Sequence, residues 1–208
     1  MNSSQLLLFL LTSFIVIITP GQDMILVISR SISQGKKAGI ATAAGISTGL
    51  IGHTLLAAFG LGALLQISNT LFIVVKIIGA SYLFYLGLKL FNVKKSELEL
   101  YDLKTTALHR LYLQGAISNI SNPKIAIFYF AFLPQFISVE SSTPTINLLV
   151  LGFLFSILTL LIKAPIGYIA GSLSIWLRNN KLFKAWLNKI SGIVLIILGL
   201  KLVLSSSK

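Results

Sequence analysis

Long apolar segments constrain the fold of this chain more than any other feature. Stretches of about 20 mostly apolar residues recur along its 208 residues, and a helix of about that length crosses the hydrocarbon core of a bilayer. No water is available there to the backbone, so each spanning segment must satisfy its own hydrogen bonds. The sequence therefore predicts an all-α polytopic membrane protein with six transmembrane helices, at 5–29, 39–65, 70–90, 112–136, 146–176 and 185–204.

Composition agrees with a membrane location. The chain is 55% hydrophobic and 11% charged, with a mean hydropathy of +0.91. A net charge of +12 would suggest nucleic acid in a soluble protein, but cytoplasmic loops explain it here and no nucleic acid is expected. The absence of cysteine excludes disulfides and thiolate metal sites, and no cofactor is indicated. With no basic residue before the first apolar segment, we expect that segment to be retained as a span.

The basic residues predict the orientation in the membrane. The loops near Ser68 and Glu140 contain no basic residue, whereas the loops after the first, third and fifth predicted spans are rich in them. By the positive-inside rule the basic loops are cytoplasmic, and both termini then lie outside the cytoplasm. The residues of the basic loops are Arg30, Lys36, Lys37, Lys89, Lys94, Lys95, Lys104, Arg110, Arg178, Lys181, Lys184 and Lys189.

The charged segment 91–111 divides the chain into two halves, 1–90 and 112–208, which we interpret as two repeats joined by a cytoplasmic linker. Each half holds three predicted spans, so the second half is inverted relative to the first. The sequence LGLKL occurs at 86–90 and again at 198–202, which gives weak support to a repeat.

The first span is interrupted at 19–23. Pro20 lacks a backbone donor and Gly21 adds backbone freedom. Thr19 followed by Gln22 fits the capping-box pattern, which predicts a new helix that starts at Thr19 with Pro20 at its first position. Asp23 would then lie in the first turn, and an ionisable residue inside a span indicates a functional site. The alternative is a proline kink with a paired or snorkelling aspartate.

The fourth span carries a second interruption. Asn122 is a good N-cap residue directly before Pro123, which predicts another helix start. Both breaks lie about 15 Å from the predicted cytoplasmic end, at 1.5 Å per residue. Two half-helix N-termini that meet inside the membrane are typical of transporter sites that bind an anionic group. The alternative is two unrelated kinks.

Further candidates lie in the other spans. Gly45 and Gly49 have the small-xxx-small spacing that allows close helix packing, within the chain or in a homodimer. His53 follows at the same spacing, either as a hydrogen-bonded packing residue or as a proton carrier. Three lysines also lie within spans, namely Lys76, which could snorkel, Lys124 beside the second break, and Lys163 deep in the fifth span. Three lysines and one aspartate suggest a bound anion or a neutral lysine.

Several stretches together resemble the LysE/RhtB family of bacterial amino-acid exporters. They are Thr19-Pro20-Gly21 with Asp23, RSISQGKKAG at 30–39, KIIGASYL at 76–83, Asn122-Pro123-Lys124, and FLPQF at 132–136. The resemblance implies an inner-membrane efflux protein for small amino acids such as threonine or homoserine, driven by proton exchange. Gln22 stands where family members usually carry a second proline.

We therefore predict a secondary transporter in which Thr19, Pro20, Gly21, Asp23, Asn122, Pro123, Lys124, Lys163, Lys76 and His53 contribute to substrate binding or proton coupling. A passive channel or a membrane assembly subunit is the alternative. An intramembrane hydrolase rests on GISTG at 45–49, but Ser47 and His53 would lie ~120° apart on one helix and could not pair. The spans also lack a Cys, Met or His cluster for a soft metal.

Overall fold

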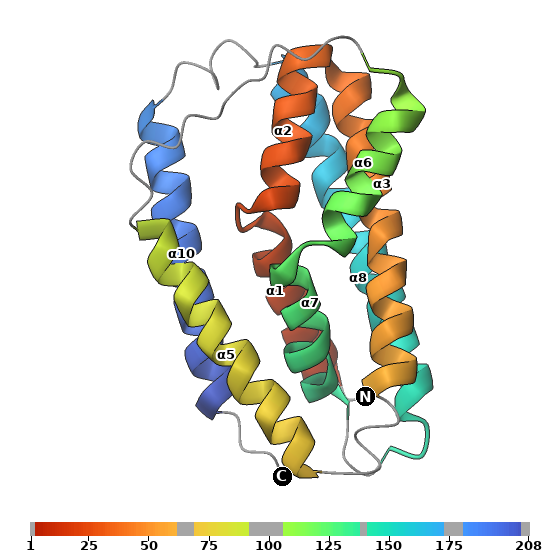
Figure 1. Ribbon diagram of the computed structural model, residues 1–208, viewed down its shortest axis with the longest axis vertical. Helices are drawn as coiled ribbons and strands as arrows, with labels where there is room; N and C mark the ends of the chain where they lie inside the picture. The colour runs from red at the N-terminus through yellow and green to blue at the C-terminus, as the bar shows by residue number, and fades with distance from the viewer. Residues whose placement is uncertain (1–2, 62–68, 92–105, 138–140, 173–180, 205–208) are drawn as a thin grey trace.

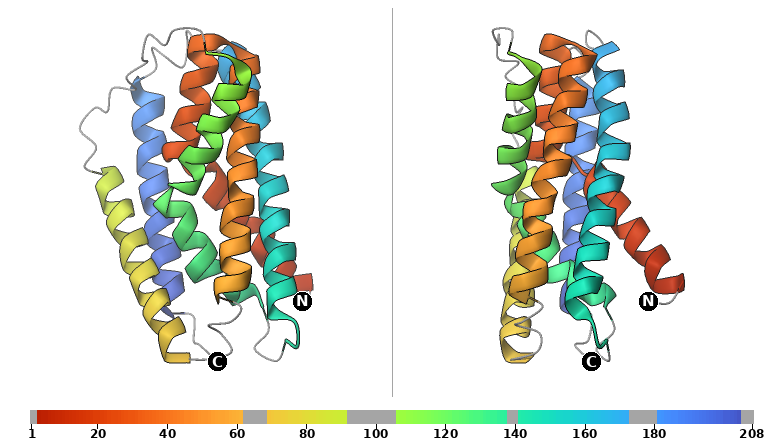
Figure 2. Two further views of the ribbon diagram at one scale, coloured as in Figure 1. Left: turned by 45° about the vertical axis from the view of Figure 1, so that its right-hand side comes forward. Right: turned by 90° about the vertical axis from the view of Figure 1, so that its right-hand side faces the viewer.

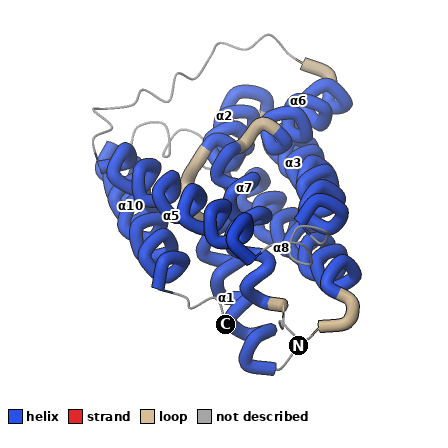
Figure 3. Tube along the Cα trace, turned by 60° about the horizontal axis from the view of Figure 1, so that its bottom comes forward, coloured by secondary structure: helices blue, strands red, loops and turns tan. Residues whose placement is uncertain are grey.

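The computed structural model describes residues 3–61, 69–91, 106–137, 141–172 and 181–204 (Figure 1). Within these residues every regular element is helical, as the tube in Figure 3 also shows. The all-α prediction is confirmed. Most of the linker predicted at 91–111 lies outside the described residues, as do the ends of the second and fifth predicted spans and the loops near Ser68 and Glu140.

The first predicted span consists of two helices. Helix α1 is Ser3–Ile18 and α2 is Gln22–Gln34, and the chain bends by 53° between them. Gly35 then turns the chain, with φ of +87°, a conformation that favours glycine. Its N–H donates to Ser31 O at 2.9 Å. Helix α3, Lys36–Leu56, follows at once and ends in a π-helical turn, η1, Ala57–Leu61.

The remaining predicted spans also contain helices. Helix α5 is Asn69–Phe91, α8 is Pro144–Ser172 and α10 is Lys181–Leu204. Helix α8 continues through Pro165. The fourth predicted span is a run of short helices: α6 Leu108–Ile120, α7 Pro123–Ile127, the π-helix η2 Phe128–Phe132 and the 3₁₀-helix η3 Leu133–Phe136.

Two of the described helices are long and apolar enough to cross a membrane by themselves, Lys36–Gly60 and Pro144–Ser172. The bent pair α1 and α2 meets the same test when taken together, and shorter apolar stretches lie in α5 and α10. Large apolar side chains that are more than half exposed cover the outside of these helices, among them Leu7, Phe59, Ile78, Ile117 and Leu161. An apolar surface of this extent suits contact with lipid.

Helix α3 packs closely against its neighbours because both sides supply glycine. A Cβ atom on Gly45 would lie 1.9 Å from the carbonyl oxygen of Tyr112 in α6, and one on Gly115 would lie 2.4 Å from that of Thr42. Gly39 meets Gly167 of α8 in the same way, at 3.0 Å. The small residues of the second predicted span therefore serve packing within the chain.

Helices α5 and α10 lie side by side along one flank of the molecule (Figures 1 and 2). On the other flank α3 contacts α2, α6 and α8. Helix α1 leaves the other helices at an angle, as the right-hand view of Figure 2 shows. The break between α1 and α2 and the break between α6 and α7 both lie about halfway along the long axis of the molecule (Figure 1).

Candidate functional site

Lys124 connects the two breaks directly. It lies at the start of α7, is 7% exposed, and its Nζ donates to Val16 O at 3.2 Å and to Thr19 O at 2.9 Å. The last carbonyl groups of a helix have no partner within the helix. The ammonium group of the second break thus binds carbonyls at the C-terminal end of α1, and Gly21 leaves room for it, since a Cβ there would lie 3.2 Å from Nζ.

The prediction that Thr19 starts the helix after the first break is wrong. Helix α2 begins at Gln22 with Gly21 before it and no side-chain cap, so Pro20 lies between the helices. The hydroxyl of Thr19 donates back to Ile15 O at 2.6 Å, and its N–H donates to the same oxygen at 3.0 Å. Threonine commonly forms this bond to the preceding turn, which here competes with the capping bond.

The second break has the predicted cap. Asn122 Oδ1 accepts a hydrogen bond from the backbone N–H of Lys124 at 3.1 Å, and Pro123 occupies the first position of α7. Asn122 is 2% exposed, so the cap is made where water is scarce. The helix-start prediction at Asn122 and Pro123 is confirmed.

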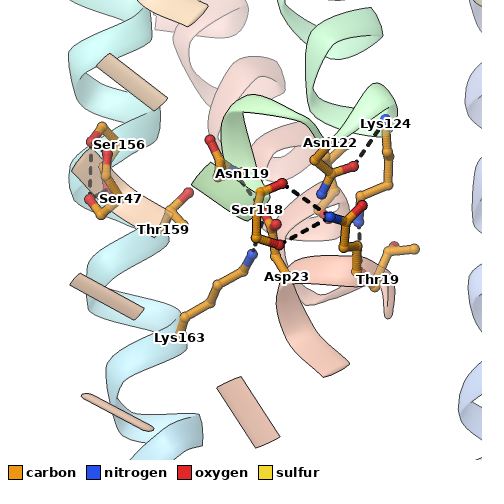
Figure 4. A network of polar contacts seen from close by, with 12 residues as sticks. Thr19, Asp23, Ser47, Ser118, Asn119, Asn122, Lys124, Ser156, Thr159 and Lys163 are labelled. Atoms are coloured by element: carbon orange, nitrogen blue, oxygen red, sulfur yellow. Dashed lines mark hydrogen bonds and ion pairs between the residues drawn. The ribbon is translucent and has the colours of Figure 1, made fainter. Parts of the chain in front are cut away.

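Asp23 is the negative group at the centre of the molecule. Its Oδ2 accepts from Lys163 Nζ of α8 at 3.2 Å and from Asn119 Nδ2 of α6 at 2.8 Å. Asp23 is 2% exposed and Lys163 is 3% exposed, so this ion pair is shielded from solvent. Figure 4 shows these side chains converging from three helices. A buried carboxylate needs such partners, because an unpaired charge away from water is costly.

Four buried polar atoms at or beside this centre have no hydrogen-bond partner in the described part of the chain. They are Asp23 Oδ1, Asn119 Oδ1, Asn122 Nδ2 and His53 Nδ1. The partners of each amide fix its orientation: Asn119 donates to Asp23, and Asn122 accepts from the N–H of Lys124. The amide of Asn122 faces the carboxylate of Asp23, so the unused donor and acceptors of this centre form one polar cluster around Asp23.

Sequence analysis missed two residues of this centre. Ser118 accepts hydrogen bonds from Gln22 Nε2 through its carbonyl oxygen at 3.2 Å and its Oγ at 3.1 Å, and Asn119 binds Asp23. Both belong to the polar run 118–122 in an otherwise apolar span, which is the signal that could have identified them. Gln22, which stands where proline was expected, therefore links α2 to α6 across the breaks.

His53 of α3 adjoins the same centre. Its Nε2 is 3.1 Å from the backbone oxygen of Asn119, and its ring centroid is 5.6 Å from that of Tyr129 in η2. The ring is 4% exposed, and Nδ1 has no partner among the described residues. The structure thus places His53 next to Asn119, and Asn119 in turn binds Asp23. The side chain of Lys76 lies outside the described residues.

Comparison with known proteins identifies the family. The LysE type translocator family matches residues 14–206. The chain belongs to this family. Membership confirms the resemblance inferred from the motifs and the prediction of a multi-span membrane transport protein. It also agrees with the prediction that the chain is not an enzyme.

Named relatives of this LysE-family protein cover almost all of it. The uncharacterized membrane protein YrhP of Bacillus subtilis is 33% identical over 97% of this chain and 99% of its own length. The homoserine/homoserine lactone efflux protein of Salmonella typhimurium is 31% identical, covering 92% of both chains. An uncharacterized membrane protein of Vibrio cholerae is 30% identical over 85% of this chain and 89% of its own length. No solved structure matches the chain.

The hydrolase alternative finds no support in the contacts of this LysE-family protein. Ser47 Oγ donates to Ser156 O at 2.7 Å, and Ser156 Oγ donates to Ser47 O at 2.6 Å. Ser47 and His53 therefore have separate partners, on α8 and α6. Among the described residues no group of three His, Cys, Asp or Glu side chains could hold a metal ion.

Proposed function

We propose that this protein is a secondary active exporter of small amino acids across the bacterial inner membrane, and that it works by proton antiport. The observation that carries the proposal is the buried centre of Asp23, Lys163 and Asn119, with spare polar atoms beside it. Charged groups inside a membrane protein mark substrate and proton pathways. Most buried polar groups in folded proteins are hydrogen-bonded, so unused donors and acceptors gathered around one buried ion pair suit a ligand.

The spare atoms match the two ends of an amino acid. Asp23 Oδ1 and Asn119 Oδ1 are acceptors suited to an ammonium group, and Asn122 Nδ2 is a donor suited to a carboxylate. Lys163 and Lys124 give the centre one more positive than negative charge when all three groups are ionised, which favours the carboxylate end. Thr19, Pro20 and Gly21 shape this region through the first break, and Pro123 shapes it through the second.

The name of the Salmonella relative narrows the range of candidate substrates. Homoserine and its lactone share the α-ammonium group, but the lactone has neither a free carboxylate nor a free hydroxyl. The ammonium group is therefore the charged feature that the two compounds have in common. Asp23 is the negatively charged side chain of the centre described here, so we assign ammonium recognition to it.

The transport cycle rests on six spans arranged as two inverted repeats, with both termini outside the cytoplasm. The reciprocal bonds between Ser47 and Ser156 support the repeats, because a two-fold axis makes each contact occur twice with the partners exchanged. Those residues lie on α3 and α8, the middle helices of the two halves. One half would rock against the other, with the breaks as pivots.

The test is transport in proteoliposomes. Vesicles that hold the purified protein are preloaded with a panel of radiolabelled amino acids, including threonine, homoserine and homoserine lactone, and efflux is followed with and without an imposed pH gradient. Uphill movement of a small amino acid that depends on the gradient supports the proposal. Downhill movement alone would indicate a passive channel, and no movement of any compound would favour an assembly subunit.

A further inference from the structure

The two buried lysines of the centre are bound in different ways. Lys124 Nζ donates to two backbone carbonyls, Val16 O and Thr19 O. Lys163 Nζ has one acceptor among the described residues, Asp23 Oδ2, although an ammonium group has three N–H donors. Both side chains are buried. Lys124 is therefore held by the fold, whereas Lys163 is held by a single charged partner.

The partner of Lys163 is also the group that a substrate ammonium would bind. Asp23 Oδ2 already takes two hydrogen bonds, from Lys163 and Asn119, while Oδ1 takes none among the described residues. The primary ammonium of Lys163 has the charge and donor number of the ammonium of an amino acid. The side chain of Lys163 thus makes the contact with Asp23 that a substrate ammonium would make.

Building on the proposed function, we infer that Lys163 is a tethered competitor of the substrate: its ammonium holds Asp23 in the empty transporter, and the substrate ammonium displaces it. Once displaced, the Lys163 side chain is a buried cation without a carboxylate, so its neutral form is favoured. One Nζ–H bond of Lys163 breaks, its electron pair stays on nitrogen, and the proton leaves to water. The substrate ammonium keeps its three protons.

The charges around Lys163 favour this release. Helix α2 contributes Asp23, which the substrate occupies, and α7 contributes Lys124, a like charge that disfavours a second cation nearby. Helix α3 contributes His53 beside Asn119, and the described sequence of α1 contains no ionisable side chain. Asp23 is therefore the group whose loss changes the balance for Lys163.

Competition between proton and substrate is what an antiporter requires. A carrier that binds either a proton on Lys163 or a substrate on Asp23, but not both, must exchange one for the other. High pH in the cytoplasm favours substrate loading with proton release, and lower pH outside favours protonation of Lys163 and substrate release. This order of events gives export.

Proton release by the unmodified protein is the primary test. L-homoserine binding is measured by isothermal titration calorimetry of purified full-length protein in two buffers with different ionisation enthalpies. We expect about one proton released per bound homoserine, and affinity that rises about tenfold per pH unit where Lys163 titrates. Binding without proton release would overturn the inference. N-acetyl-homoserine, which lacks the ammonium, should neither bind nor release a proton, and proton release on its binding would also overturn it.

Variants identify the source of the proton. Lys163→Gln cannot carry the charge, while Asp23 keeps the hydrogen bond from Asn119 and the nearby charge of Lys124, which hold its carboxylate ionised. We therefore expect homoserine binding without proton release and with affinity constant within about twofold per pH unit. Lys37→Gln makes the same chemical change at an exposed position of α3, and it should release protons as the unmodified protein does. Proton release that persists in Lys163→Gln would overturn the inference. If the unmodified protein neither binds nor moves any compound of the panel, the proposed function fails, and the inference fails with it.

Discussion

The break between α1 and α2 and the break between α6 and α7 share a sequence signal, a polar residue followed by proline, but different contacts stabilise them. The second break is capped by its own residue, Asn122. The first break has no side-chain cap, and its carbonyl groups are bound by Lys124 from the second break. The second break is thus stabilised by its own cap, whereas the first break is stabilised by a residue of the second.

The two breaks also differ in charge. Asp23 at the first break is held by Asn119, before the second break, and by Lys163 of α8. The first break therefore depends on groups from α6, α7 and α8. A ligand that competes for those groups can therefore change the conformation of the first break, whereas the capped second break keeps its conformation. Four substitutions test this division, from the largest expected effect to the smallest.

Asp23→Asn should have the largest effect. It leaves Lys163 as a buried charge without its counterion, which typically costs about 3–5 kcal/mol. We expect a lower unfolding temperature in detergent, followed by far-ultraviolet circular dichroism, and loss of gradient-driven efflux in proteoliposomes.

The double variant Asp23→Asn with Lys163→Met separates stability from transport. It removes both charges, and an apolar replacement of a buried ion pair is often neutral for stability. We expect the unfolding temperature to return close to that of the unmodified protein while transport stays absent. Normal gradient-driven efflux in Asp23→Asn would show that the charge at the first break has no part in transport.

Lys124→Met should rank second. Methionine has a similar length but no donor, so Val16 O and Thr19 O lose their partner at about 1–2 kcal/mol each, or about 2–4 kcal/mol in total. The backbone N–H of residue 124 still donates to Asn122, so the second break keeps its cap. We expect faster amide hydrogen exchange around 19–23 than around 122–127. Equal acceleration at both breaks would contradict the dependence of the first break on Lys124.

The same contrast explains what could be predicted from the sequence. The six apolar segments and the helix start at Asn122 follow from local patterns. Each of these segments contains helix, and α7 begins directly after Asn122, as predicted. Thr19 also fits a local pattern, but its hydroxyl can accept from the N–H groups that follow or donate to a carbonyl oxygen of the preceding turn, and the pattern does not decide between them. The carbonyl oxygen of Thr19 is bound by Lys124, which lies 105 residues away.

Contacts between distant helices set the rest of the site. Asn119 binds Asp23 across 96 residues, and Lys163 binds it across 140. A lysine inside a span is conspicuous by its charge, so Lys163 could be proposed from the sequence. Asn119 is uncharged, and although the polar run 118–122 marks it, asparagine is common where helices end, so the sequence does not show that it binds Asp23.

Asn122→Ala should have a moderate effect, because it removes the cap of the second break. Loss of an N-cap typically costs about 1 kcal/mol. We expect a small decrease in the unfolding temperature and faster amide exchange at Lys124. Asn122→Ser keeps an oxygen acceptor without adding a charge beside Asp23 and should preserve the cap, so a large loss from both variants would point to a role other than capping.

Thr19→Val should have the smallest effect on stability. The hydroxyl of Thr19 donates to Ile15 O, and that oxygen also accepts from the N–H of residue 19, so valine leaves no buried carbonyl without a partner. Valine keeps the branched shape, and Thr19 O stays available to Lys124. We expect a change within about 0.5 kcal/mol, well below that of Asn122→Ala. A loss as large as that of Asn122→Ala would mean that Thr19 caps α2 after all, and that the two breaks are built alike.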